Sequence, residues 1–499
     1  MTQRILEWTS DRFSQQNVLW LSGIAGSGKS TLSTSIADYF RRWNRLGAFL
    51  FFNRDVAERS DPGAVIRTLA YQLGTFYPPL GEAMSAVIEK TPNILISPIN
   101  YQFDQLIADL HPAIASMPIG LPVVFVIDAL DECGTMETRE ALIEILSEKL
   151  GALSSFRFII TGRPDVDIAV AFDSHPHILR IEVDITSPRL GHDIALYFTH
   201  QTMLIQKRKK HLGRDWPGEV NIQSLTARAS GLFVWASTAA KFLNSHDPAK
   251  RLGILLKGVT NQGAEKALDT LYITALQSVG MWDDEEFVSD FRDIMSIVLA
   301  LHKPLSAAAI DELLVTLDGR PSIDTVSQIG CVVSSTPVVR VLHPSFGDFL
   351  LDRSRCGRDI WHFHKGANNI NIALLCIQRL NGFLRRNMCN LTLSVNFGEL
   401  DGSLTEDIDY ACVFWIAHLC AIDDESPSLL DDLMGFLHKH IVHWFEAMSI
   451  LRRSRDTIFM LQNLMTWIKV SSSVLSVAYF PTSICSMSLA LIAKGYWRL

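Results

Sequence analysis

The chain has 499 residues, of which 48% are apolar and 20% are charged, so large buried cores are expected and global disorder is excluded. A chain of this length suggests about three or four structural units. The formal net charge of −8 gives no overall attraction for nucleic acid or anionic lipid, so we expect neither nucleic acid nor a membrane as a partner. The 8 cysteines are scattered without a metal-type spacing, and the first residues carry no apolar run of the signal-peptide type, which indicates a cytoplasmic protein.

The first half of the chain alternates short apolar runs with helical patterns. Helical periodicity follows the first run, with Leu32 and Ile36 on one face, and it returns over residues 62–73. The apolar runs are continuous rather than alternating, which indicates strands buried on both faces of a parallel sheet. These strands are predicted at residues 18–23, 47–53, 122–130, 157–164 and 177–183. The pattern predicts an α/β three-layer sandwich.

Beyond about residue 186 the strand signals fade and helical patterns take over. Residues 192–256 and 263–318 read as amphipathic helices, and residues 331–343 form a β-like patch that we interpret as the wing of a winged-helix module. Helical patterns return from residue 361 onward. The apolar segment 474–493 contains a proline and several hydroxyl residues, so we favour a buried segment over a membrane span there.

A glycine-rich loop after the first predicted strand carries the strongest chemical signal. Residues 23–31 read GIAGSGKST, which fits the Walker A pattern GxxxxGK[ST] between a strand and a helix. Small residues let backbone N–H groups point at phosphate oxygens, and the helix N-terminus adds a favourable dipole. Lys29 can reach the β- and γ-phosphates, and Ser30 can bind Mg²⁺. The nucleotide-binding residues predicted in this loop are Gly23, Gly26, Ser27, Gly28, Lys29, Ser30 and Thr31.

Acidic residues follow the third predicted strand, as in a Walker B motif. The strand ends at Asp128, whose carboxylate we expect to hold the Mg²⁺ shell. Asp131 and Glu132 are candidates for polarising the attacking water, with capping of the next helix as the alternative. Arg163 follows the fourth strand and is a candidate for sensing the γ-phosphate, with a surface salt bridge as the alternative.

At these motifs the sequence resembles the NACHT family of signal-transduction ATPases (the STAND class of P-loop NTPases), in the fungal or nephrocystin-3-like form. The match comprises residues 23–31, IDALDEC at 127–133 and ITGRPD at 160–165. Weaker matches follow at GLFVWAST (231–238), VLHPSFGDFLLD (341–352) and YACVFWIAHL (410–419). Related receptors often have Gly-x-Pro at the adenine, where this chain has Gly231-Leu232-Phe233. Ala129 replaces the glycine common after the first Walker B acid.

The resemblance implies a domain order and one further nucleotide contact. It implies that His343, in the winged-helix segment, contacts the β-phosphate of ADP; by itself, a histidine in an apolar stretch is more often a core residue. Family members usually carry further N- and C-terminal regions, so we expect this chain to be a family core without them. The implied domains are an N-terminal helical remnant (1–16), a nucleotide-binding domain (17–190), a helical domain (191–262), a winged-helix-like domain (263–360), a second helical domain (361–470) and an apolar tail (471–499).

The resemblance implies a molecular switch that binds ATP or ADP with Mg²⁺, with GTP as the alternative nucleotide. Slow hydrolysis would control a change between a closed ADP form and an open NTP form, the NTP form would self-associate, and protein partners would bind through the absent terminal regions. One alternative is a turnover enzyme such as a small-molecule kinase, but the sequence has no segment resembling an arginine-rich lid. Another is an interaction scaffold with a dead pocket, against which the intact Lys29, Ser30 and Asp128 argue.

Overall fold

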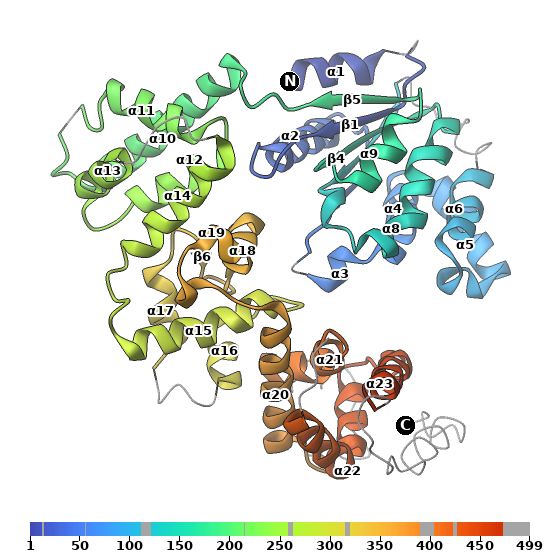
Figure 1. Cartoon of the computed structure of the whole chain (residues 1–499). Helices are drawn as coiled ribbons and strands as arrows, with labels where there is room; N and C mark the ends of the chain where they lie inside the picture. Colours follow the sequence, from blue (N-terminus) through green and yellow to red (C-terminus); the bar gives the residue numbers. More distant parts are fainter. Residues whose placement is uncertain are drawn as a thin grey trace. The chain divides into compact units, whose positions relative to one another are not determined.

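The computed structural model of the chain describes residues 1–11, 14–54, 56–110, 121–213, 215–257, 263–314, 320–389, 404–422 and 427–472. The chain divides into two compact units, Met1–Thr274 and Ala275–Leu499. The first contains a parallel sheet followed by helices, and the second is mainly helical (Figure 1). The predicted apolar tail lies almost entirely outside the described residues.

The sheet of the first unit has five parallel strands within the described part of the chain. Their spatial order is β2-β3-β4-β1-β5, so β4 lies between β1 and β3. All residues of β1, β3 and β4 are buried, which confirms the expectation for these strands. The expectation was wrong for β2 and β5, which lie at the two edges of the sheet and have exposed residues. The strands are β1 (Val18–Ser22), β2 (Leu46–Phe51), β3 (Val123–Asp128), β4 (Phe156–Gly162) and β5 (Ile178–Glu182).

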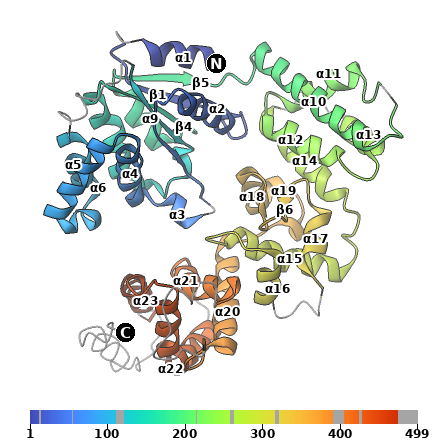
Figure 2. The same cartoon turned by 180° about the vertical axis from the view of Figure 1, so that it is seen from behind.

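Helices cover both faces of this sheet and make the predicted three-layer sandwich (Figure 1, Figure 2). Alternate side chains of β1 point to opposite layers: Trp20 joins the core beneath α4, α5, α6, α8 and α9, and Leu21 joins the core beneath α1 and α2. The helices of this sandwich are α1 (Thr2–Ser10), α2 (Lys29–Arg42), α3 (Ala57–Ser60), α4 (Val65–Phe76), α5 (Pro78–Lys90), α6 (Ile99–Leu106), α8 (Met136–Glu144) and α9 (Val166–Asp173).

The N-terminal helix α1 packs directly on the sheet. Ile5 is fully buried, and Trp8 is 8% exposed in the same core as Leu21. Arg157 of β4 stacks over the Trp8 ring at 5.8 Å and donates a hydrogen bond to the Asp11 carbonyl oxygen at 2.8 Å. These contacts attach the first residues of the chain to the sandwich.

A helical segment follows β5 in the first unit. Phe198 of α10 and Trp235 of α12 meet edge to face at 6.2 Å, and the Trp235 indole donates to the Ala267 carbonyl oxygen at 3.1 Å. These contacts hold α10, α12 and α14 together. The helices are α10 (Pro188–Arg208), α11 (Glu219–Ala229), α12 (Phe233–Leu243), α13 (Pro248–Lys257) and α14 (Ala264–Gln277).

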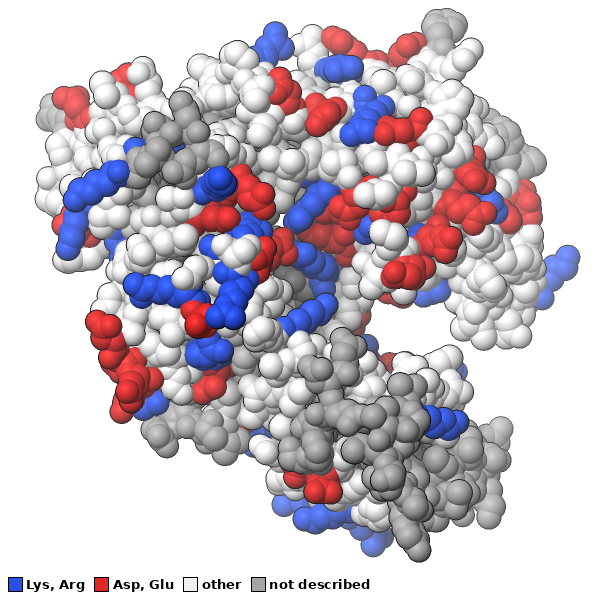
Figure 3. All heavy atoms as spheres, viewed as in Figure 1, with Lys and Arg blue, Asp and Glu red and all other residues white. Residues whose placement is uncertain are grey.

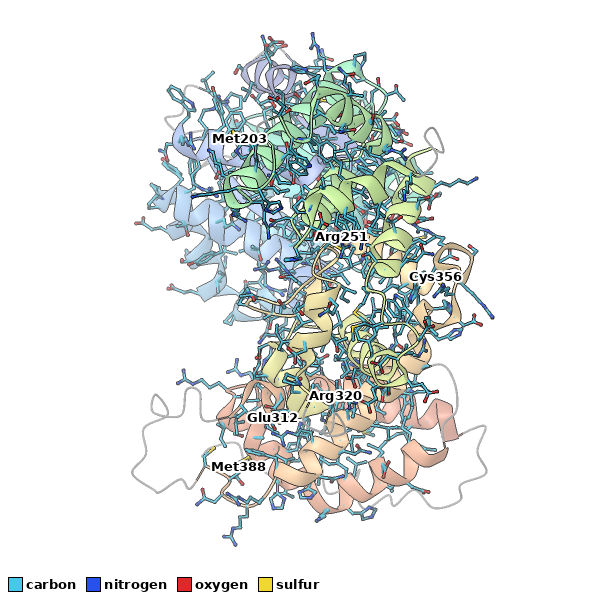
Figure 4. All side chains as sticks on the ribbon, turned by 90° about the vertical axis from the view of Figure 1, so that its left-hand side faces the viewer. Met203, Arg251, Glu312, Arg320, Cys356 and Met388 are labelled. Carbon is cyan, nitrogen blue, oxygen red and sulfur yellow. The ribbon has the colours of Figure 1, made fainter. Side chains whose placement is uncertain are left out.

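The second unit places a short hairpin among helices. Val333 pairs with Val341 in an antiparallel register between β6 (Val333–Ser334) and β7 (Arg340–Val341), inside the predicted β-like patch. The winged-helix assignment of this region stays a prediction. Arg320, labelled in Figure 4, forms ion pairs to Asp290 at 2.8 Å and Glu286 at 3.2 Å. The helices are α15 (Glu285–Ala300), α16 (Ala307–Leu313), α17 (Ser322–Gln328), α18 (Pro344–Leu351), α19 (Arg353–Cys356), α20 (Lys365–Phe383), α21 (Glu406–Cys420), α22 (Pro427–Ile450) and α23 (Asp456–Ser472).

Acidic and basic side chains are interspersed over the face drawn in Figure 3. Among the described residues, no helix is both long enough and apolar enough to cross a membrane.

Candidate nucleotide-binding site

The Walker A loop connects β1 to α2 at the carboxyl edge of the sheet. Gly26 has φ +75° and Gly28 has φ +95°, a left-handed conformation that other residues adopt only at a cost. Gly28 is the N-cap of the 14-residue helix α2, so the backbone N–H groups of the first helical turn face the loop. Ser30 is exposed in that turn, where its hydroxyl could bind a cation. The loop therefore has the conformation that phosphate binding requires.

Lys29 folds back on the loop that contains it. Its side chain is buried, and its ammonium group donates hydrogen bonds to the carbonyl oxygens of Gly23 at 2.7 Å and Ile24 at 2.9 Å. Burial lowers the pKa of Lys29, and the charge of Asp131 opposes that shift. Ser27 has a buried hydroxyl without a hydrogen-bond partner among the described residues. Phosphate oxygens could satisfy both groups, so these residues fit a nucleotide.

The predicted Walker B carboxylate lies at the end of β3. Asp128 is fully buried, and its Oδ1 accepts a hydrogen bond from the Thr161 hydroxyl at 2.5 Å. Its Oδ2 is buried and has no hydrogen-bond partner within the described part of the chain. A buried carboxylate oxygen without a donor is costly unless a cation or water completes its shell. Asp128 and Ser30 thus fit Mg²⁺, which would neutralise phosphate charge.

The structure places the two candidate catalytic acids differently. Both belong to the short helix η4 (Leu130–Glu132). Asp131 accepts a hydrogen bond from the Arg163 backbone at 3.0 Å and pairs with the Arg163 guanidinium at 3.2 Å. Glu132 accepts a hydrogen bond from the Arg54 backbone at 3.4 Å, in the segment after β2. Asp131 and Arg163 are therefore already paired with each other, and their catalytic roles stay predictions.

Two residues that the sequence analysis did not select connect these loops. Thr161 lies two positions before Arg163 in the ITGRPD motif, but its contact with Asp128 depends on β4 being next to β3. Arg139 of α8 is buried, bonds to Asp165 at 3.0 Å and Asp167 at 2.7 Å, and donates to the Asp131 carbonyl oxygen at 3.1 Å. No local sequence pattern indicates that Arg139 reaches both the segment at Asp131 and the start of α9.

The N-terminus of α12 returns to the Walker A loop. The Val234 backbone N–H donates a hydrogen bond to the Gly26 carbonyl oxygen at 3.2 Å. A Cβ atom on Gly26 would lie 2.1 Å from the Val234 side chain, and one on Gly28 would lie 3.1 Å from the Phe233 ring. The GLFVWAST segment is therefore in contact with the phosphate-binding loop.

His343 belongs to the second unit. It is the N-cap of α18, and its Nδ1 accepts a hydrogen bond from the Ser345 backbone N–H at 3.2 Å. Because Nδ1 is an acceptor, the neutral imidazole carries its proton on Nε2. The predicted contact of His343 with ADP stays a prediction.

The first third of the chain, which contains most of this site, is similar to a known protein family. Residues 1–163 match the family model described as Nephrocystin 3, N-terminal. The predicted family resemblance is confirmed. The matched region contains β1 to β4, the Walker A loop, Asp128 and Arg163.

Matches to individual proteins extend beyond this region. The chain is 24% identical over 479 residues to the vegetative incompatibility protein HET-E-1 of Podospora anserina, an alignment that covers 88% of this chain. The chain spans about a third of that protein, since the alignment covers 33% of its length.

Solved structures show only a distant likeness. A Walker-type ATPase of Pyrococcus abyssi is 12% identical with a TM-score of 0.35, covering 70% of this chain and 93% of its own. Cdc6p from Pyrobaculum aerophilum is 12% identical with a TM-score of 0.30, covering 68% of this chain and 88% of its own.

Proposed function

We propose that this chain is a nucleotide-dependent switch that binds ATP or ADP with Mg²⁺ and hydrolyses ATP slowly. The observation that best supports the proposal is the hydrogen bond from Val234 of α12 to Gly26 of the Walker A loop. A helix outside the sandwich thereby contacts the loop whose backbone N–H groups would bind the phosphates. If nucleotide binding changes the conformation of this loop, the hydrogen bond would transmit the change directly to the position of α12.

The switch requires that the nucleotide distinguish two conformations. A ligand shifts an equilibrium only by its differential affinity for the two states. The Lys29 ammonium is bonded to the loop carbonyls of Gly23 and Ile24, and a phosphate would compete for those hydrogen bonds. Rearrangement of the loop around the phosphate would weaken or strengthen the Gly26–Val234 contact, which links nucleotide state to helix position.

Slow hydrolysis is consistent with the pairing of the candidate catalytic groups. Arg163 is engaged by the Asp131 carboxylate, so it must leave that carboxylate before it can stabilise charge on a γ-phosphate. Glu132 would orient the attacking water. Hydrolysis then ends the NTP state rather than supplying a product.

The output of the switch is self-association in the NTP state, with protein partners bound through regions outside this chain. His343 would stabilise the ADP state by donating to the β-phosphate. The relative's name suggests vegetative incompatibility as the biological setting. A cytoplasmic location fits such a role.

The proposal is tested by the nucleotide content and local dynamics of the purified protein. We expect chromatography of the denatured protein to release ADP, and hydrogen exchange in residues 231–243 to differ between the ADP- and ATP-bound forms. Lys29→Ala is the control, because removal of its ammonium group should abolish nucleotide retention and the exchange difference. Absence of nucleotide binding, or exchange that is identical in both nucleotides, would contradict the switch.

A further inference from the structure

Thr161 lies at a junction between three strands of the sheet. Its side chain is fully buried, and its residue pairs with Leu21 of β1 in the parallel register. On the other side of β4, its hydroxyl reaches the end of β3. Thr161 thus lies between the strand that leads into the Walker A loop and the strand that ends at Asp128.

The Thr161 hydroxyl makes two hydrogen bonds to the Walker B segment. It donates to Asp128 Oδ1 at 2.5 Å and accepts from the Ala129 backbone N–H at 3.0 Å. Ala129 has φ +59°, a left-handed conformation unusual for alanine. One hydroxyl therefore fixes both the Asp128 carboxylate and the direction in which the chain leaves β3.

The second oxygen of the carboxylate is left for another partner. Asp128 Oδ2 is buried and has no hydrogen-bond partner among the described residues. Because Thr161 holds Oδ1, the carboxylate cannot rotate to exchange its two oxygens without losing a short, charge-assisted hydrogen bond. Oδ2 is thereby kept in one direction.

We infer that Thr161 is a positioning residue that orients the Asp128 carboxylate toward the Mg²⁺ shell of the bound nucleotide. The inference rests on the proposed function, because it needs a nucleotide that binds with Mg²⁺. Thr161 acts through Asp128. Its removal should weaken the energetic coupling between Mg²⁺ and nucleotide and leave metal-free nucleotide binding unchanged.

The test uses three substitutions of Thr161 in the full chain, which separate the effect of the hydroxyl group from the effect of side-chain size. Thr161→Val keeps the branched shape without the hydroxyl, Thr161→Ser keeps the hydroxyl, and Thr161→Ala differs from Thr161→Ser in the hydroxyl alone. Calorimetric titration of ADP in Mg²⁺ and in chelator gives the Mg²⁺ enhancement of affinity. Mn²⁺ binding in the presence of ADP, followed by electron paramagnetic resonance, provides a second readout.

We expect Thr161→Val and Thr161→Ala to lose roughly 10-fold of the Mg²⁺ enhancement and of Mn²⁺ affinity, which corresponds to one charge-assisted hydrogen bond. Thr161→Ser should retain both, and all variants should bind ADP equally in chelator. Thr202→Val is the matched control, since Thr202 is also a buried threonine but its hydroxyl bonds only to backbone carbonyls of α10.

Other outcomes separate the two proposals. If Thr161→Ser behaves like Thr161→Ala, the role depends on size and the inference is wrong, even if Thr161→Val does not fold. If wild type binds ADP but Mg²⁺ does not enhance that binding, the inference is also wrong while nucleotide binding stands. If wild type binds neither ATP nor ADP, the proposed function itself fails.

Discussion

A single residue at the end of β3 shows how this chain departs from the pattern of the family that it resembles. Ala129 occupies a position where glycine is common in the resembling family, and its φ of +59° and ψ of +48° are left-handed. An L-residue pays about 1–2 kcal/mol for that conformation, whereas glycine does not. The hydrogen bond from the Ala129 N–H to Thr161 helps to maintain it.

Replacing Ala129 with glycine should therefore stabilise the protein. We expect Ala129→Gly to raise the free energy of unfolding by about 0.5–1 kcal/mol, since relief of strain exceeds the entropy that glycine loses on folding. The control is Ala195→Gly within α10, which should lower stability by about 1 kcal/mol. Urea unfolding of both variants checks the prediction, and a loss of stability in Ala129→Gly would contradict it.

Ion pairs between elements hold the carboxyl edge of the sheet together. Arg139 of α8 is the centre of one such network, with a side chain that is 5% exposed and Asp167 as a 15% exposed partner. Burial alone would raise the pKa of Asp167, but the hydrogen bonds and charge of Arg139 outweigh it and hold that pKa below its ordinary value. This contribution to stability is present above the ordinary carboxyl pKa and is lost as pH falls through the lowered folded-state pKa.

Arg139→Met should leave these carboxylates uncompensated. We expect the free energy of unfolding to fall by roughly 2–4 kcal/mol. This loss is somewhat smaller than for a fully buried ion pair, because the Asp165 side chain is partly exposed to water. Arg41→Met is the matched control: Arg41 pairs with Asp38 on the exposed surface of α2, so its loss should cost about 0–1 kcal/mol. Equal effects of the two substitutions in thermal and urea unfolding would show that the Arg139 network does not stabilise the sheet edge.

A buried histidine cluster links α20 and α21 in the second unit. The His418 ring bonds to Asn369 at 3.0 Å and to the Tyr410 hydroxyl at 2.7 Å, and the His302 ring lies 4.6 Å from it. Since Asn369 offers its carbonyl oxygen, His418 Nδ1 donates to it, and in the neutral imidazole Nε2 then accepts from the Tyr410 hydroxyl. Burial lowers the pKa of both His302 and His418, and the charge of Lys365 adds to the shift at His302.

The cluster should make the second unit less stable in acid. An unfolded histidine binds a proton near its ordinary pKa of 6.5, while the buried rings do not, so stability is full above that pH and falls below it. We expect the urea midpoint from tryptophan fluorescence to be lower at pH 5.5 than at pH 7.5. His418→Leu should reduce this pH dependence, whereas His438→Gln on an exposed site of α22 should retain it. An unchanged pH dependence in His418→Leu would contradict the role of the cluster.

At the scale of the whole molecule, the proposed switch needs a residue of the second unit to sense the nucleotide, and His343 is the candidate. His343 also caps α18, so substitution by leucine removes two functions at once. Asparagine accepts a hydrogen bond at an N-cap but lacks the imidazole Nε2 donor, which makes His343→Asn the matched control for capping.

We expect both His343→Leu and His343→Asn to weaken ADP binding by roughly 10- to 100-fold, the value of a charge-assisted hydrogen bond to phosphate. ATP affinity should change less, because in the proposed switch His343 contacts the nucleotide only in the ADP state. Only His343→Leu should lose about 1 kcal/mol of stability with the cap. Calorimetric titration of both nucleotides measures the affinities. An unchanged ADP affinity in His343→Asn would restrict His343 to its capping role, and equal weakening of ATP and ADP would contradict a contact specific to the ADP state.

Local sequence determined the elements of this protein and the loop that begins its site. The five strands were predictable because each lies in a short, mainly apolar run; β1, β3 and β4 are buried on both faces, whereas the edge strands β2 and β5 keep exposed residues. The Walker A loop was predictable because all of GxxxxGK[ST] lies within eight consecutive residues, and Gly26 and Gly28 adopt the left-handed conformations that glycine permits.

Only the tertiary structure decided which partners these segments meet. Strand order β2-β3-β4-β1-β5 places Thr161 against Asp128, although the two residues are 33 positions apart. Arg139 reaches Asp167 across 28 positions, and Val234 reaches Gly26 from a helix beyond the sheet. A single sequence reports local periodicity and motif spacing. It does not report strand order or which buried polar groups share a hydrogen bond, because these depend on long-range packing that many sequences of the same pattern could satisfy differently.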